Sequence, residues 1–228
     1  TVHFNVTCGK GSIIFTVKFS RLKLNELTTD SSAIIVEDGE FTFFGSSVAI
    51  NNQNYTVIGA PGILDSPHIV GDGSEDICGA IRIYNDLSHV FTINGEEIRD
   101  RFGRTVAINN LNDIIVGSPG NSKVYIYKNV SADSWGLSIS MEADISSGFT
   151  NYFGYSIAIN DNYVLVGYPP GKINPDDAAA PTQYAYVNIY SLSGNDISLT
   201  KTICGEEINT YFGYSLAIND NNDIIIGD

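Results

Sequence analysis

Short runs of alternating apolar and polar residues, separated by turn residues, cover most of this chain. The segment Ser47-Val48-Ala49-Ile50 alternates with the period of two that is typical of a β-strand. No stretch of the sequence has an apolar stripe with the 3.6-residue period of an amphipathic helix. The pattern therefore predicts an all-β fold.

Four segments of the chain repeat one order of residues. Each opens with Phe-Gly, continues through an alternating strand and a turn rich in Asn or Asp, and reaches a second Gly after a β-branched strand. The Phe-to-Phe steps are 58, 51 and 59 residues, and the second Gly follows the first by 14, 14, 13 and 14 residues. The repeated positions are Phe44, Gly45, Gly59, Pro61, Phe102, Gly103, Gly117, Pro119, Phe153, Gly154, Gly167, Pro169, Phe212, Gly213 and Gly227.

Each unit contains four alternating or β-branched runs. The first run follows the Phe-Gly pair. The other three are predicted at 55–58, 80–84 and 89–93 in the first unit. In the second unit they are predicted at 113–116, 123–127 and 137–141, and in the third at 163–166, 186–190 and 197–203. Four-stranded units repeated along a chain are typical of a β-propeller, in which each blade packs on its neighbours. We expect the Phe of each unit to plug the core between blades. The small residues Ala49, Ala107, Ala158 and Ala217 fit a crowded first strand near the axis.

The predicted organisation is a single propeller region over residues 1–228. Complete blades are expected over 44–101, 102–152 and 153–211, and the first half of a further blade over 212–228. Residues 1–43 are expected to supply strands three and four of a preceding blade, from Ser12–Ser20 and Ala33–Val36. Pairing of the two terminal half-blades would close a four-bladed ring and remove sheet edges. Because the last unit stops after its second strand, we favour a part of a larger propeller.

The four units resemble FG-GAP repeats, the blades of the integrin α-subunit propeller. The resemblance rests on Phe-Gly paired with Gly-small-Pro, as in Phe44-Gly45 with Gly59-Ala60-Pro61, and covers the chain from about residue 40. The compact form of the units is closer to the short microbial, protist and viral variety. In the last unit Asp228 stands where a small residue is expected. The resemblance implies a propeller engaged in adhesion or recognition at a surface.

Many blades of that family hold calcium in a DxDxDG loop between their first two strands. The corresponding turns here are shorter, with no carboxylate in Asn51–Asn54 and only two in Asn219–Asp223. Calcium takes six to eight oxygen ligands, several of them from carboxylates. Because these turns depart from the family's calcium loop, the resemblance predicts a propeller without calcium bound in them. No other cofactor is expected.

Two insertions interrupt the units after their second strand. The insertion at 62–79 clusters Asp72, Glu75 and Asp76 beside a glycine, which makes these three residues candidate calcium ligands. A solvated acidic loop is the simpler interpretation, and we favour it. The insertion at 171–185 carries Asp176 and Asp177. Binding residues concentrate on loops over rigid scaffolds, so both insertions are candidate sites.

The charge of the chain restricts the class of partner. Twenty-six acidic and 12 basic residues give a net charge of −14, which disfavours nucleic acid and anionic lipid as ligands. The longest apolar runs are too short to insert into a bilayer. The chain does not begin with Met, so we expect a processed or trimmed chain, and any targeting segment would lie outside the sequence.

The sequence lacks a catalytic constellation. His3, His68 and His89 fall in unrelated places, and no G-x-S-x-G motif occurs. The pairs Glu96-Glu97 and Glu206-Glu207 occupy the same point of their units, so they are interpreted as a repeated loop sequence. We therefore predict a protein that is not an enzyme.

Cysteines and sequons add little to the choice of function. Cys8, Cys78 and Cys204 lack the spacing of a metal site. We favour buried or unpaired thiols and leave one disulfide open. Asn5, Asn54 and Asn129 begin Asn-x-Ser/Thr sequons and are candidate glycosylation sites.

These observations favour an extracellular or surface-exposed interaction module. Its expected partner is a protein or glycan on a surface, or further copies of the chain itself. The alternatives are a structural building block of a filament, sheath, appendage or particle coat, and a propeller enzyme that acts on polysaccharide. The sequence leaves the partner and the oligomeric state open.

Overall fold

The computed structural model describes residues 6–9, 12–19, 33–36, 43–62, 78–97, 100–143, 152–169, 184–208 and 211–228. Every regular element within these ranges is a β-strand. The prediction of an all-β fold made of four-stranded antiparallel sheets is therefore confirmed.

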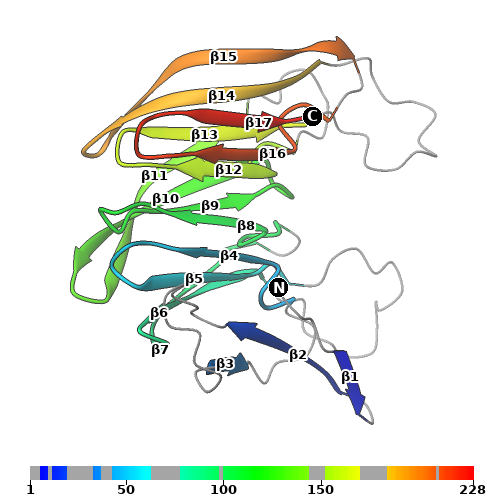
Figure 1. Cartoon of the computed structure of the whole chain (residues 1–228), viewed down its shortest axis with the longest axis vertical. Coiled ribbons are helices and arrows are strands. Elements are labelled where there is room, and N and C mark those ends of the chain that lie inside the picture. The colour runs from blue at the N-terminus through cyan, green and yellow to red at the C-terminus, as the bar shows by residue number, and fades with distance from the viewer. Residues whose placement is uncertain are drawn as a thin grey trace.

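Three four-stranded sheets follow one another along the chain, and each is a meander whose strands pair in sequence order (Figure 1). The first blade contains β4 (Ser47–Ile50), β5 (Tyr55–Ala60), β6 (Ala80–Asn85) and β7 (Ser88–Asn94). The second contains β8 (Thr105–Ile108), β9 (Ile114–Ser118), β10 (Lys123–Ser131) and β11 (Ser134–Glu142). The third contains β12 (Ser156–Ile159), β13 (Tyr163–Tyr168), β14 (Tyr184–Ser193) and β15 (Asp196–Ile208). A two-stranded sheet of β16 (Ser215–Ile218) and β17 (Ile224–Gly227) follows.

The N-terminal sheet has three strands, one more than the sequence predicts. β1 (Val6–Gly9) pairs antiparallel with β2 (Ser12–Phe19), which in turn pairs with β3 (Ala33–Val36). Our prediction of two strands omits β1. The segment Val6–Gly9 lies outside the repeated units, and Gly9 is unfavourable in a strand.

The blades are arranged side by side through their first strands. β4 lies beside β8, β8 beside β12, and β12 beside β16. In Figure 1 the first, second and third blades follow one another from bottom to top, and β16 and β17 overlap the third blade in this view. This is the radial arrangement of a propeller, in which the inner strand of each sheet meets the inner strands of its neighbours.

A hydrophobic core fills each space between blades, and the Phe of the motif lies within it. Phe102 is 2% exposed and packs with Ile81 and Ile83 of the first blade and with Val116 of the second. Phe153 is also 2% exposed and occupies the corresponding place between the second and third blades. The phenyl ring therefore joins its own blade to the preceding one.

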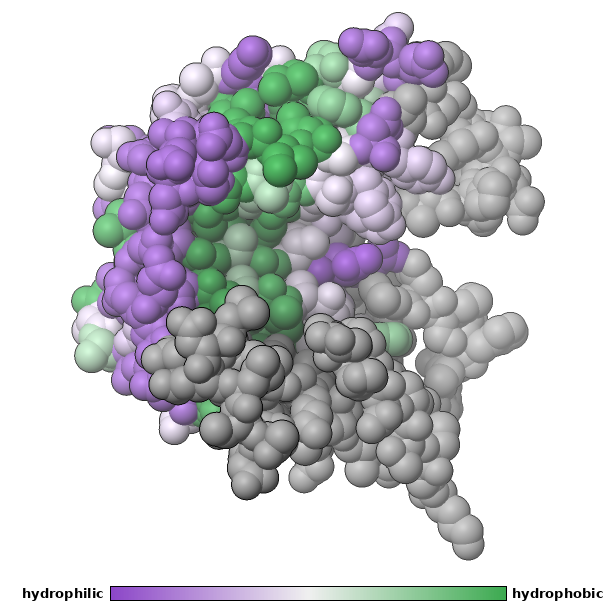
Figure 2. Space-filling model, in the orientation of Figure 1, coloured by the Kyte–Doolittle hydropathy of each residue, from purple (hydrophilic) through white to green (hydrophobic). Residues whose placement is uncertain are grey.

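The first and last Phe residues have different described partners, because Phe44 contacts its own blade and the partly buried Phe212 contacts the preceding one. Phe212 packs against Val187 and Ile189 of the third blade. Phe44 packs against Ile58 and Tyr84, on the face of the first blade opposite to Phe102. Figure 2 shows apolar residues along the middle of this face, beside a band of hydrophilic residues that runs along one side.

A hydroxyl group of each blade is hydrogen-bonded to the Phe-Gly turn of the next blade. Ser47 Oγ donates to the carbonyl oxygen of Gly103 at 2.9 Å, and Thr105 Oγ1 donates to that of Gly154 at 2.8 Å. Ser156 Oγ makes the same bond to Gly213. The hydroxyl lies three residues after Phe in every unit, so the bond recurs at each junction. We call this bond the junction hydrogen bond.

The second Gly of each unit is required by the same junction. A Cβ atom at Gly117 would lie far inside van der Waals contact of the Gly154 carbonyl oxygen and of Thr105 Oγ1. Gly59 and Gly167 meet the turn glycines of the following blades in the same way. The turn glycines themselves have positive φ values of 79° to 87°, which glycine adopts without strain.

The outer pair of strands carries a β-bulge in every complete blade. The register shifts between Ile83 and Tyr84, between Ile126 and Tyr127, and between Ile189 and Tyr190. A bulge bends and twists a strand, which makes the edge of the sheet a poor template for another strand. The repeat thus protects the three outer edges.

The junction hydrogen bond predicts a cost for removing one hydroxyl. Thr105→Val keeps the shape of the side chain but leaves the Gly154 carbonyl oxygen without its donor, so the free energy of unfolding falls by about 1–3 kcal/mol. Urea denaturation measures this change. Thr200→Val, at an exposed position of β15, is the control and changes the stability by less than about 0.5 kcal/mol. Equal effects of both substitutions would contradict the assignment.

Candidate functional site

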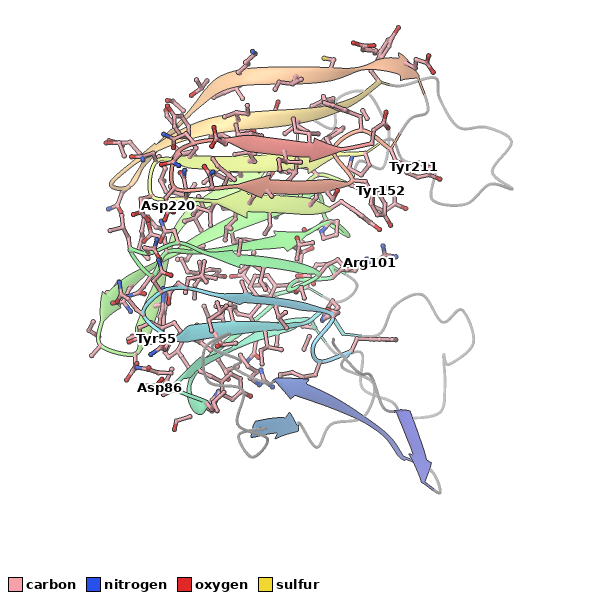
Figure 3. The ribbon with its side chains drawn as sticks, in the orientation of Figure 1. Tyr55, Asp86, Arg101, Tyr152, Tyr211 and Asp220 are labelled. Carbon is pink, nitrogen blue, oxygen red and sulfur yellow. The ribbon has the colours of Figure 1, made fainter. Side chains whose placement is uncertain are left out.

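The propeller has two rims, and different residues form them. The Phe-Gly turns lie at one end of the blades, and the Asn-rich turns between the first and second strands lie at the other. Figure 3 shows Arg101, Tyr152 and Tyr211 at the first end and Asp220 at the second. We define the FG rim by the six residues Arg101, Arg104, Tyr152, Tyr155, Tyr211 and Tyr214.

The repeat places these residues in pairs around each Phe-Gly turn. One member precedes Phe and the other follows Gly, so the two are the first and fourth residues of a β-turn. The backbone N–H of Tyr155 donates to the carbonyl of Tyr152 at 2.9 Å, and that of Tyr214 to Tyr211 at 2.8 Å. Arg104 and Arg101 close the equivalent turn at 2.9 Å. Because the buried Phe102 and Phe153 and the partly buried Phe212 anchor these turns, the pairs project from a fixed frame.

The four tyrosines form a row across two blades. The rings of Tyr152 and Tyr155 are edge-to-face, with centroids 6.2 Å apart and planes at 85°. Tyr211 and Tyr214 repeat this geometry at 5.7 Å and 87°. The centroids of Tyr155 and Tyr214 lie 4.8 Å apart, which connects the two pairs.

A hydrogen-bonded chain runs along the row from an arginine. The guanidinium of Arg104 lies over the Tyr155 ring at 5.2 Å from its centroid, and Nη2 is 3.5 Å from the Tyr155 hydroxyl. Tyr155 donates its own proton to the Tyr214 hydroxyl at 2.7 Å. The cation therefore both stacks on the ring and orients its hydroxyl group.

Burial keeps the central phenol protonated. Burial raises the pKa of Tyr155, the hydrogen bond that Tyr155 donates to Tyr214 raises it as well, and Arg104 opposes both, so the pKa is about 12. Tyr155 is 8% exposed, whereas Tyr211 is 54% and Tyr214 44% exposed. The row thus has a buried centre and two exposed rings at one end. Exposed aromatic rings on a rigid frame are typical of interfaces, because they combine apolar area with a polar tip.

Asparagines stabilise the opposite rim. Asn51 Oδ1 accepts hydrogen bonds from the backbone N–H groups of Gln53 and Tyr55, which closes its own turn. Its Nδ2 donates to the Asn109 carbonyl at 2.9 Å and to Asn112 Oδ1 at 2.6 Å in the next blade. The sequence indicated the turns, but the bonds between blades were not expected.

The same connection recurs one and two blades further along. Asn109 Nδ2 donates to the Asn160 carbonyl at 3.4 Å. Asn160 Nδ2 donates to the Asn219 carbonyl at 2.9 Å and to Asn222 Oδ1 at 2.8 Å. Asn51, Asn109 and Asn160 are all buried. These turns are therefore structural contacts between blades.

This rim does not fit calcium. The asparagine oxygens that face the turn already accept backbone N–H groups, and the amide nitrogens repel a cation. In the ranges that the structure describes, no group of three or more His, Cys, Asp or Glu side chains is placed to hold a metal ion. Asp72, Glu75 and Asp76 lie outside those ranges, as do Asp176 and Asp177.

The predicted sequons lie in different surroundings. Asn129 is at the end of the β10–β11 hairpin, where its Nδ2 donates to the Ser134 carbonyl at 3.2 Å and Ser131 is exposed. Asn54 is partly buried in the turn before β5, and its sequon residue Thr56 is 8% exposed. Asn5 lies outside the described ranges.

The remaining candidates are spread over the molecule. His89 lies in β7 and pairs with Thr92, while His3 and His68 are outside the described ranges. Cys78 and Cys204 are free thiols. No helix in the described part of the chain is long and apolar enough to span a bilayer.

Sequence reasoning missed the FG rim. It assigned Phe and Gly to packing and did not compare the positions that flank them. The signal was present, because Tyr occupies both flanking positions in two consecutive units. Arg101 and Arg104 occupy them in the unit before.

The raised pKa of Tyr155 predicts that its hydroxyl group ionises at a higher pH in the folded chain than in the unfolded chain. Because the folded chain holds the Tyr155 proton more tightly than the unfolded chain, stability falls as the pH rises from about 10 to about 12. Tyr155→Phe removes this contribution, so its stability falls less over that range. Chemical denaturation at successive pH values measures the difference. Tyr163→Phe, at the first residue of β13 and away from the FG rim, is the control. Identical pH profiles for Tyr155→Phe and the parent chain would contradict the assignment.

Comparisons with known proteins agree with the architecture. No protein-family model matches the chain. It is 34% identical over 93 residues to integrin alpha-5 of Xenopus laevis, a match that spans 36% of this chain and 8% of the integrin. It is 30% identical over 88 residues to integrin alpha-8 of Gallus gallus, spanning 34% of this chain and 7% of that protein.

The structural comparison indicates the same fold. The WD40 domain of Pan2 from Neurospora crassa superimposes with a TM-score of 0.53 at 6% identity, covering 95% of this chain and 57% of that one. At such low identity the likeness concerns the fold alone. The chain is thus a β-propeller with distant, partial similarity to integrin alpha subunits.

Proposed function

We propose that this chain is a non-enzymatic binding module that engages a protein partner through the FG rim at an extracellular or particle surface. The observation that carries the proposal is the row of tyrosines and arginines on consecutive Phe-Gly turns. Tyr and Arg are enriched among the residues that contribute most to protein–protein affinity. The partial similarity to integrin alpha subunits supports a role in binding.

The chemistry of the rim supports binding in preference to catalysis. A general acid or base works best when its pKa lies near the working pH. The pKa of Tyr155 is raised to about 12, so this phenol keeps its proton near neutral pH. The tyrosines and arginines of the rim donate hydrogen bonds and provide apolar area.

The bulged outer strands of the three blades argue against the alternative role as a building block of a filament or coat. A subunit that assembles with its copies by pairing of edge strands would present a flat, unpaired edge strand. β7, β11 and β15 instead each pair with their neighbour through a bulge. The geometry therefore favours recognition by a rim over growth by edge pairing.

The proposal is tested with the double substitution Tyr211→Ala and Tyr214→Ala. We expect binding of the labelled chain to the surface of its source cells, measured by flow cytometry, to fall about tenfold or more. Tyr184→Ala, an equally exposed tyrosine in β14, is the matched control and retains binding. Circular dichroism verifies that both variants are folded.

Treatment of the cells identifies the class of partner. Protease treatment is expected to abolish binding, whereas periodate oxidation of glycans is expected to leave it. Undiminished binding by the double variant would contradict the role of the FG rim. Loss of binding after periodate alone would contradict a protein partner.

A further inference from the structure

One carboxyl group is buried in the connection from the first blade to the second. Asp100 lies between β7 and β8 and is 3% exposed. Its Oδ1 accepts the backbone N–H of Phe102 at 2.9 Å. Its backbone carbonyl accepts the hydroxyl group of Ser118 at 2.9 Å and the N–H of Gly120 at 2.8 Å. We call Asp100 and these three partners the Asp100 joint, because they connect the Phe-Gly turn of the second blade to the turn that follows β9.

The other units of the repeat carry no charge at this position. The residue two places before Phe is Thr42 in the first unit, Asn151 in the third and Thr210 in the fourth. The side-chain oxygen of Thr or Asn is a neutral acceptor for a nearby backbone N–H group. The charge of Asp100 is therefore not a general requirement of the repeat, and it calls for a separate explanation.

The surroundings of Asp100 oppose its ionisation. Oδ2 lies close to the backbone of Gly95, where an added Cβ atom would be 3.0 Å from it. Burial raises the pKa of the carboxyl group, hydrogen bonds from the backbone N–H groups of Phe102 and Glu97 lower it, and the charges of Glu97 and Glu96 raise it. The pKa stands above its ordinary value as a result. A buried carboxylate costs free energy that the protonated acid does not.

Charged and titratable groups reach this region from β10 and β11 as well as from the chain around Asp100. They are Glu96, Glu97, Arg101, Lys123, Tyr125, Tyr127 and Glu142. Burial raises the pKa of Tyr125 and of Tyr127, so both phenols keep their protons at neutral pH. Lys123 Nζ is 3.1 Å from Glu142 Oε1. Asp100 is the buried acid of this group, so its proton is the one that alters the joint.

We propose that the Asp100 joint is a pH-dependent contact at the start of the second blade, which holds the Phe-Gly turn firmly when Asp100 is protonated and releases it more often when Asp100 is ionised. This inference goes beyond the proposed function and does not depend on a partner. The turn carries Arg101, which lies at the FG rim in Figure 3, and Arg104. Acidification therefore orders this arginine pair, and neutral pH allows it more motion.

The direction of the effect follows from proton linkage. The folded chain binds the Asp100 proton more tightly than the unfolded chain, because its pKa is raised. This contribution to stability is complete below the ordinary value of 3.8 and is lost as the pH rises through the higher folded value. The tyrosines of β10 keep their protons over this range, so they do not produce the same change.

Native-state hydrogen exchange of the whole chain, read by NMR at successive pH values, tests the inference. We expect the protection factors of the Phe102 and Arg104 amides to fall about threefold or more between about pH 4 and pH 7, since each unit of pKa shift changes an equilibrium tenfold. The Tyr155 amide closes the equivalent turn one blade further on and is the internal control. Its protection is expected to change by less than about twofold.

Two variants remove the charge and keep an acceptor for the Phe102 N–H. Asp100→Asn introduces the residue of the third unit, and Asp100→Thr introduces that of the first and fourth. Both are expected to lose the pH dependence at Phe102 and Arg104. A cost that is independent of pH cancels in this comparison, so the result does not require equal stability. Asp196→Asn, at an exposed position of β15, changes the net charge equally and keeps the parent profile.

A double substitution tests the neighbouring charges. Glu96→Gln with Glu97→Gln is expected to reduce the pH dependence without abolishing it, because burial is the larger cause of the raised pKa. Glu206→Gln with Glu207→Gln, at the same point of the third unit, is the matched control and keeps the parent profile.

The inference is overturned if protection at Phe102 and Arg104 does not fall over this range. It is also overturned if protection falls equally at Tyr155, since the effect would then belong to the whole fold. Retention of the parent pH dependence by either folded variant at Asp100 would contradict it as well. If one of these variants does not fold, the other decides. None of these outcomes measures partner binding, so each leaves the proposed function unchanged.

Discussion

The carbonyl group of one glycine at each Phe-Gly turn is the contact on which the propeller depends. It accepts the junction hydrogen bond from the preceding blade and lies against a residue that has no side chain. A polar backbone group that loses its partner in such a place costs about 1–3 kcal/mol. The neighbouring Phe fills the core between the same two blades. One turn therefore joins a polar and an apolar contact, and each blade is positioned by its neighbours.

The properties of the FG rim follow from this junction. The turn that buries Phe153 also sets the directions of Tyr152 and Tyr155, which flank it. Consecutive turns are alike, so their flanking residues come to lie beside one another across the junction. The hydrogen bond from Tyr155 to Tyr214 joins residues 59 positions apart. The geometry of the FG rim thus follows from blade packing.

The sequence predicts the strands well because the repeat supplies four independent copies of the pattern. It indicates the turns of Asn51 and Asn160, since Asn bonds to its own backbone locally. It does not reveal the junction hydrogen bonds or the amide contacts between blades, because those pairs lie 49 to 62 residues apart. The strand β1 was missed because it lies outside the repeated units and ends in a glycine. The tyrosine row was missed because each member has an ordinary local context, and only the packing of two blades brings them together.

Within each Phe-Gly turn, some residues face the junction between blades and others face the rim, and this difference has an evolutionary consequence. Phe, Gly and the hydroxyl residue face the junction, so changes there disturb two blades at once. The second residue after Phe is Ser46 in one unit, Arg104 in the next and Tyr in the following two, although all four turns keep one backbone geometry. Substitution at these positions therefore changes the chemistry of the rim without changing the turn that carries it. A scaffold of this kind can acquire new partners by single substitutions while its architecture is inherited unchanged.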